Sequence, residues 1–134
     1  MHKLHFLFVV VQIAMQYQAK DMIAEAEKIY RNILSEYPSH PDALHLLGVI
    51  FYQKGDPVTA IPYIERALMG NKTDEAFHNS LGECYRISGR TEDAKKHFEL
   101  ALRINPQYIS AVYNLGLTLQ EQNDWDTAIS MYQR

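Results

Sequence analysis

This sequence has a single cysteine, few flexible linker residues and a small net charge. The only cysteine is Cys84, so no disulfide framework can form within the chain, and we expect a reducing compartment, the cytoplasm. No stretch rich in glycine, serine or proline divides the 134 residues, which are predicted to form one domain, 1–134. Alternating runs of β-branched residues are few, so strands are not expected.

Charge and motif content exclude several functional classes. The chain has 13 basic and 16 acidic residues, and this mild net charge of −3 argues against nucleic acid bound by a basic stripe. It has no glycine-rich phosphate loop, no HExxH and no GxSxG motif. We therefore expect no catalytic residue, no metal and no cofactor. Cys84 is expected to be a buried structural thiol, and His78 and His97 to be packed or solvated rather than ligands.

The stretch from Glu75 to Tyr108 predicts two short amphipathic helices joined by a turn. Gly89 breaks the first helical pattern, at a place where a helix end accepts a left-handed residue. Thr91 is the expected N-cap of the second helix. One face of the first helix follows a 3.6-residue period and holds His78, Leu81, Gly82 and Tyr85.

The same unit recurs along the chain with a period of 34 residues. Four kinds of residue keep this register: small residues, turn residues, alanines and bulky residues. Internal repeats of this length are typical of stacked helix pairs. The series are Gly48, Gly82 and Gly116; Asp21, Gly55, Gly89 and Asn123; Ala26, Ala60, Ala94 and Ala128; and Tyr30, Ile64, Phe98 and Tyr132.

With these motifs the chain resembles a tetratricopeptide repeat (TPR) array. The matching residues are Leu47-Gly48, Leu81-Gly82 and Leu115-Gly116, the aromatics Phe51 and Tyr85, the series Ala94, Phe98 and Ala101, and the closing Pro38 and Pro106. The resemblance implies an all-α fold, an α-solenoid of stacked antiparallel helix pairs (a TPR superhelix) with about 3.8 repeats. The repeats fall at about 7–40, 41–74, 75–108 and 109–134, the last incomplete.

The N-terminal segment MHKLHFLFVVVQIA allows two interpretations. Lys3 and the apolar run after it resemble a secretory signal, but no cleavage site follows, and the run is too short to span a bilayer. The alternative is the first helix of repeat one. Because that interpretation fits the repeat register, we prefer it and expect no membrane partner. Its predicted core residues are Val10, Ile13, Ala14 and Tyr17.

The resemblance implies a concave groove lined by the first helix of each repeat. The side chains expected there are apolar or amide-rich, which suits an extended peptide or a partner helix. Phe8 and Val11 are also placed in this groove. The candidate partner-binding residues are Met15, His45, Val49, Tyr52, Asn79, Glu83, Arg86, Tyr113, Asn114 and Leu117.

Two functions follow as expectations. The first is a non-catalytic scaffold that binds a protein or peptide in its groove. The second is the substrate-recruiting TPR region of a larger enzyme, an expectation based on the incomplete last repeat. Asn79 and Asn114 also resemble, as a hint only, the groove asparagines of O-linked N-acetylglucosamine transferases. The last repeat also lacks a polar capping helix, so the ends could stack on a second copy.

Overall fold

The computed structural model describes residues 2–133, apart from the side chains of residues 2 and 4. Met1 and Arg134, the bounds of the predicted domain, lie outside the described residues. The described chain is all-α, as predicted, and contains no strand. Its helices are α1 (His2–Ala19), α2 (Ile23–Glu36), α3 (Pro41–Gln53), α4 (Pro57–Gly70), α5 (Glu75–Ile87), α6 (Thr91–Ile104), α7 (Ile109–Glu121) and α8 (Trp125–Tyr132).

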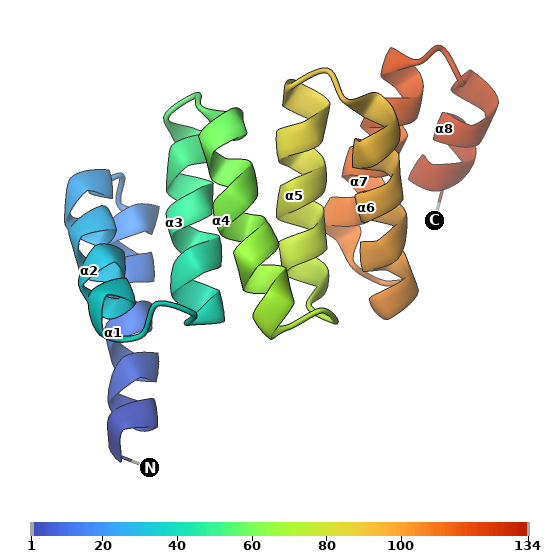
Figure 1. The fold of residues 1–134 in the computed structure, drawn as a ribbon. Coiled ribbons are helices and arrows are strands. Elements are labelled where there is room, and N and C mark those ends of the chain that lie inside the picture. The colour runs from blue at the N-terminus through green and yellow to red at the C-terminus, as the bar shows by residue number, and fades with distance from the viewer. Residues whose placement is uncertain (1, 134) are drawn as a thin grey trace. The chain divides into compact units, whose positions relative to one another are not determined.

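The helices form two compact units. Unit 1 is residues 1–70, with α1–α4, and unit 2 is residues 71–134, with α5–α8. In each unit consecutive helices lie side by side as antiparallel pairs, α1 with α2, α3 with α4, α5 with α6 and α7 with α8 (Figure 1). The pairs stack through α2 on α3 in unit 1 and through α6 on α7 in unit 2. These stacked pairs confirm the predicted fold of helix pairs, whereas the single domain over 1–134 and its repeat bounds stay predictions.

Each helix pair turns at the residue that the 34-residue series predicts. The φ angles are 62° at Asp21, 84° at Gly55, 81° at Gly89 and 63° at Asn123, all in the left-handed region. Glycine reaches this region without a Cβ clash, and Asp and Asn tolerate it better than other residues. One left-handed residue per pair therefore reverses the chain within a few residues.

The predicted N-cap of α6 is wrong by one residue. Thr91 is already helical, and Arg90 occupies the cap position without a side-chain cap. The reason is the tight turn around Gly89: the Arg90 amide donates to the Tyr85 carbonyl at 2.9 Å, which places Arg90 directly before the helix. Its guanidinium pairs with the carboxylate of Asp93, 2.9 Å away in the first turn of α6.

Two of the sequence series meet in space as one contact. A Cβ placed on Gly82 would lie 2.5 Å from Phe98 Cε1, and one on Gly116 would lie 2.7 Å from Tyr132 Cε1. The glycine of the first helix thus makes room for the bulky residue of the second helix. Such close approach of backbone and ring explains why both series hold the same period.

The N-terminal helix buries most of the predicted core residues: Ala14 is buried, and Val10 and Tyr17 pack partly buried against the core. Val11 is 4% exposed and lies in the core with Leu7 and Ala14, whereas Ile13, a predicted core residue, is 44% exposed. Val11 is therefore not a groove residue. Because α1 is apolar on nearly all sides, its sequence periodicity does not separate Val11 from Ile13, and packing against α2 and α3 makes the choice. Within the described residues, no helix combines the length and apolar character that crossing a membrane requires.

Candidate functional site

The candidate residues of unit 1 lie along α1 and α3. Met15 is exposed, while Val49 and Tyr52 are partly buried, so these three present apolar surface on the first helices. His45 is mostly buried, and this desolvation lowers its pKa to about 4. His45 is therefore neutral at physiological pH and offers no positive charge to a ligand.

Polar side chains join the two repeats of unit 1 at the ends of their first helices. Gln18 Nε2 donates to Gln53 Oε1 at 2.9 Å, and the Tyr30 hydroxyl donates to Gln18 Oε1 at 3.0 Å. Gln18 thus connects α1, α2 and α3 in one chain of hydrogen bonds. The contact fixes the register of the two first helices, which hold Met15 and Tyr52.

In unit 2 the two candidate asparagines bind each other. Asn114 Nδ2 donates to Asn79 Oδ1 at 3.1 Å, and Asn79 Nδ2 donates to Glu83 Oε1, also at 3.1 Å. Asn79 is 5% exposed and Asn114 is 9% exposed. Both amides are therefore engaged inside the unit, where they tie α5 to α7. The carboxylate of Glu83, which is partly buried, is the member of this group nearest to solvent.

Arg86 is also engaged within unit 2. Its Nη1 donates to Glu121 Oε1 at 2.8 Å, from the end of α5 to the end of α7. Its Nε is buried and has no acceptor among the described residues. Burial without an acceptor is costly for a guanidinium nitrogen, so the ion pair with Glu121 carries a desolvation cost.

The remaining candidates of unit 2 lie on α7. Tyr113 is 58% exposed, and its ring lies 6.1 Å from that of Tyr132 on α8. Leu117 is partly buried one turn further along α7. A cavity of about 330 Å³ opens beside Tyr113 and is lined mainly by apolar side chains: Ile109, Val112, Met131 and Tyr132. This part of the unit offers the contact area that an apolar side chain of a partner needs.

The polar pairs between repeats were not predicted from the sequence, although the spacing of the paired residues is a signal in the sequence. In three pairs between adjacent first helices the partners are 35 residues apart, one more than the repeat: Gln18–Gln53, Asn79–Asn114 and Arg86–Glu121. A spacing of 35 places the two residues on adjacent first helices, one position further along the second one. Only the three-dimensional stacking shows that this offset produces contact.

A histidine pair in unit 2 was missed as well. His78 Nε2 lies 3.0 Å from the Lys72 carbonyl oxygen, so it must carry the proton and donate. His78 Nδ1 then accepts from His97 Nδ1, 3.1 Å away. Burial, together with the nearby His78, lowers the pKa of His97 to about 4. The described residues contain no group of three or more metal-ligating side chains.

Cys84 is buried on α5, as the sequence predicts. Burial raises the pKa of its thiol to about 12, so the sulfur stays protonated. A protonated, inaccessible thiol is a poor nucleophile, and Cys84 acts as a small core residue.

Comparison with known proteins identifies the repeat. Two family models, both described as tetratricopeptide repeat, match residues 14–76 and 73–134. A peroxisomal targeting signal receptor of Saccharomyces cerevisiae is 32% identical over 99 residues, 73% of this chain and 16% of the receptor. A probable UDP-N-acetylglucosamine–peptide N-acetylglucosaminyltransferase SPINDLY of Hordeum vulgare is 31% identical over 124 residues, 87% of this chain and 12% of that protein.

Solved structures share the architecture. The crystal structure of YrrB, titled a TPR protein with an unusual peptide-binding site, is 25% identical with a TM-score of 0.76, covering 88% of this chain and 61% of YrrB. The chain spans only a small part of the two curated relatives, 16% and 12% of their lengths. Because the family matches together span residues 14–134, where helix pairs recur every 34 residues, the chain belongs to the tetratricopeptide repeat family.

Proposed function

We propose that the chain is a non-catalytic scaffold that binds a peptide or partner helix on the first helices of its units. The observation that carries the proposal is the pairing of exposed Tyr113 and nearby Leu117 with the fixed group of Asn79, Asn114 and Glu83. The apolar side chains supply contact area, and the two buried asparagines orient the carboxylate of Glu83, the member of the group nearest to solvent, which can accept hydrogen bonds. A surface held in place before binding loses less entropy when a partner docks.

The relatives support the same proposal. YrrB is described by a peptide-binding site, and the yeast relative is named a receptor for a peroxisomal targeting signal. A peptide ligand is therefore the partner class that these similarities favour. We further propose the cytoplasm as the location and expect neither nucleic acid nor a membrane as a partner.

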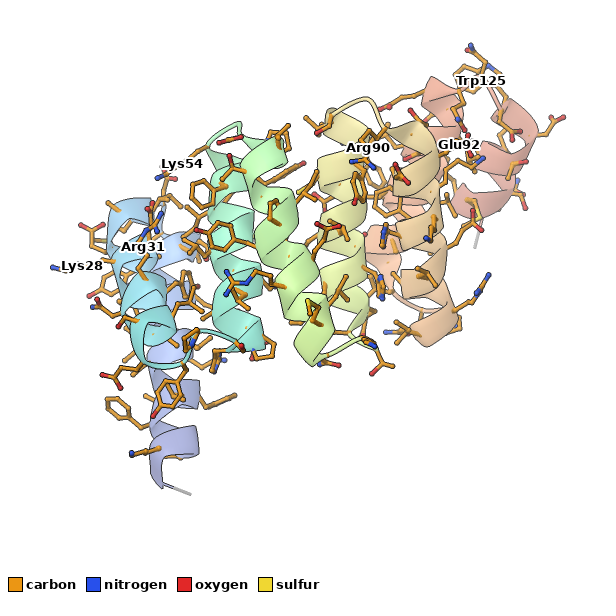
Figure 2. All side chains as sticks on the ribbon, in the orientation of Figure 1. Lys28, Arg31, Lys54, Arg90, Glu92 and Trp125 are labelled. Atoms are coloured by element: carbon orange, nitrogen blue, oxygen red, sulfur yellow. The ribbon has the colours of Figure 1, made fainter. Side chains whose placement is uncertain are left out.

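The test uses a peptide selected on the intact chain from a random display library. Tyr113→Ala combined with Leu117→Ala should lower the affinity for this peptide tenfold or more, which is the usual effect of losing an aromatic anchor. Tyr52→Ala tests unit 1 in the same way. Trp125→Ala is the matched control, because Trp125 is exposed at the start of α8 (Figure 2), away from the first helices. Loss of binding in the control alone would move the interface to the second helices.

A second candidate is the substrate-recruiting region of a larger enzyme. The specific support is the 31% identity to SPINDLY over 124 residues. Sequencing the complete open reading frame decides the matter, because a glycosyltransferase domain in the same frame is required. A short frame without one would exclude it.

Stacking of the ends on a second copy is the third expectation. Ile129 on α8, the last described helix, and Phe6 at the start of α1 are both exposed apolar side chains. Light scattering after size-exclusion chromatography, over a range of concentrations, should show a concentration-dependent mass that Ile129→Lys abolishes. A constant monomer mass contradicts this proposal and leaves peptide binding unaffected.

A further inference from the structure

A cavity on the second helices of unit 1 is lined by two arginines. It lies between α2 and α4, has a volume of about 270 Å³, and no acidic side chain lines it. The polar lining is Arg31, Arg66, Ser35 and Tyr63, and Leu34 and Leu47 provide apolar walls. The cavity is separate from the proposed partner surface of unit 1, which consists of Met15, Val49 and Tyr52 and shares none of these residues.

Both guanidinium groups are held in place from one side. Arg31 Nε donates to Glu27 Oε2 at 2.9 Å, and its guanidinium lies 5.8 Å from the centre of the Phe51 ring. Arg66 Nη2 donates to the carbonyl oxygen of Pro38 at 2.9 Å. A guanidinium has five N–H donors, so each arginine retains donors beyond these contacts. Anchored arginines of this kind lose little freedom when they bind an anion.

The charge around the cavity is positive. Glu27 is the carboxylate that pairs with Arg31, and it also pairs with Lys54 at the end of α3. Figure 2 shows Arg31 on α2 and Lys54 on the same unit. Of the charged groups, only the guanidinium groups of Arg31 and Arg66 line the cavity. Their two positive charges match a dianion.

The site is particular to unit 1. In the 34-residue register, the position of Arg31 corresponds to Glu99 in unit 2, and the position of Tyr63 corresponds to Met131. The surface of α6 around Glu99 forms another cavity, but Glu92 and Glu99 line it together with lysines and an arginine. A mixed-charge lining of that kind does not select an anion. The repeat architecture alone therefore does not produce the arginine cavity.

We propose that this cavity binds a phosphorylated side chain of a peptide. A phosphate monoester has three peripheral oxygens and close to two negative charges, so both guanidinium forks and a hydroxyl can donate to it at once. A carboxylate has two oxygens and one charge, which a single arginine already satisfies. The apolar walls Leu34 and Leu47 suit the carbon part of the phosphorylated side chain. This surface is independent of the first-helix surface of the proposed function.

The experiment is calorimetric titration of the intact chain with four probes. These are a short peptide containing phosphotyrosine, the same peptide with phosphoserine, the unphosphorylated peptide, and inorganic phosphate alone. We expect a phosphopeptide to bind, and the unphosphorylated peptide to bind at least about tenfold more weakly, the effect of losing charge-assisted hydrogen bonds. Binding should weaken as salt is raised.

Variants assign the binding to the cavity. Arg31→Gln and Arg66→Gln should each weaken the phosphopeptide by about tenfold, and Arg31→Lys should weaken it too, because lysine lacks the fork. Arg103→Gln, at an exposed arginine of α6, is the matched control and should bind as the unaltered chain does. Circular dichroism checks that each variant is folded.

The remaining outcomes contradict the proposal. Equal affinity for the phosphorylated and the unphosphorylated peptide would show that the cavity does not recognise the phosphate group. If inorganic phosphate binds as tightly as the best phosphopeptide, free phosphate is the ligand of the cavity and the peptide contributes nothing to binding. Unchanged affinity in both Arg31→Gln and Arg66→Gln moves the site elsewhere. Tyr113→Ala leaves phosphopeptide affinity intact, so failure here and failure of the first-helix proposal are told apart.

Discussion

Arg86 and Glu121 pair at 2.8 Å in unit 2, at the two repeat positions where Gln18 and Gln53 pair at 2.9 Å in unit 1. Each residue of unit 2 is 68 positions, two repeats, beyond its counterpart in unit 1. The same stacking contact is thus made once by charges and once by amides. The geometry of the stack demands complementary polar groups here, and their charge is free to vary.

The first prediction concerns this ion pair. Arg86→Gln together with Glu121→Gln copies the amide pair of unit 1 and should change the free energy of unfolding by less than about 1 kcal/mol. Glu121 is largely exposed, so solvent screens the charge interaction. A double-mutant cycle by urea denaturation measures the coupling. A coupling well above 2 kcal/mol would show that the charges, and not the shape of the contact, hold the stack.

The second prediction concerns the asparagine pair. Asn79→Val alone should cost about 1–3 kcal/mol, because it leaves the buried amide of Asn114 without its main acceptor. The double variant Asn79→Val, Asn114→Leu places the residues of unit 1, Val11 and Leu46, at these positions. It should recover part of the lost stability, since no buried amide is left unpaired and the partly buried Glu83 carboxylate, which loses both asparagine donors, is the group nearest to solvent. Additive losses in urea denaturation would contradict this account.

The third prediction concerns the glycine of the first helix. Gly82→Ala should destabilise unit 2 by about 1–3 kcal/mol, because the new Cβ would lie 2.5 Å from the Phe98 ring in a packed core. Lys96→Ala, on the exposed face of α6, is the control and should stay within about 0.5 kcal/mol. Thermal unfolding measures both. An unchanged melting temperature for Gly82→Ala would mean that the ring moves aside at little cost.

The fourth prediction concerns pH. The pKa values of His45 and His97 are lowered to about 4 by burial, from an unfolded value of 6.5. The unfolded chain therefore binds protons before the folded chain does. The free energy of unfolding therefore keeps its full histidine contribution above about pH 6.5. It decreases as the pH drops toward 4, by roughly 1–2 kcal/mol per histidine at pH 5.

A variant of unit 2 tests the histidine pair. The groups near His97 are His78 and Tyr85 on α5, and Asp93 and Lys96 on α6. The double variant His78→Leu, His97→Tyr places the residues of repeat two, Leu44 and Tyr63, at these positions. Urea denaturation between pH 7 and pH 4.5 should show a shallower loss of stability than in the unaltered chain. Identical pH profiles would contradict a role for the pair.

Much of the fold could be predicted because its determinants are local. A left-handed residue every 34 positions fixed each reversal of the chain, as at Gly55 and Asn123. Among the candidate partner residues of the first helices, Tyr113 is exposed on α7, whereas Asn79 and Asn114 are buried. Their role in binding stays a prediction. The Asn79–Asn114 bond could not be predicted, because it depends on an offset of one residue between stacked helices.

The sequence by itself determined the helix pairs, the turns and the fit of glycine against a bulky residue, since these arise within one 34-residue unit. Only the tertiary structure decided that Val11 and not Ile13 is buried on α1, because that helix is apolar nearly all round. It also decided that the amides of Asn79 and Asn114 bind each other, and that Arg31 and Arg66 line one cavity. Stacking brings together residues from different repeats, and a periodic sequence does not specify the distance between them.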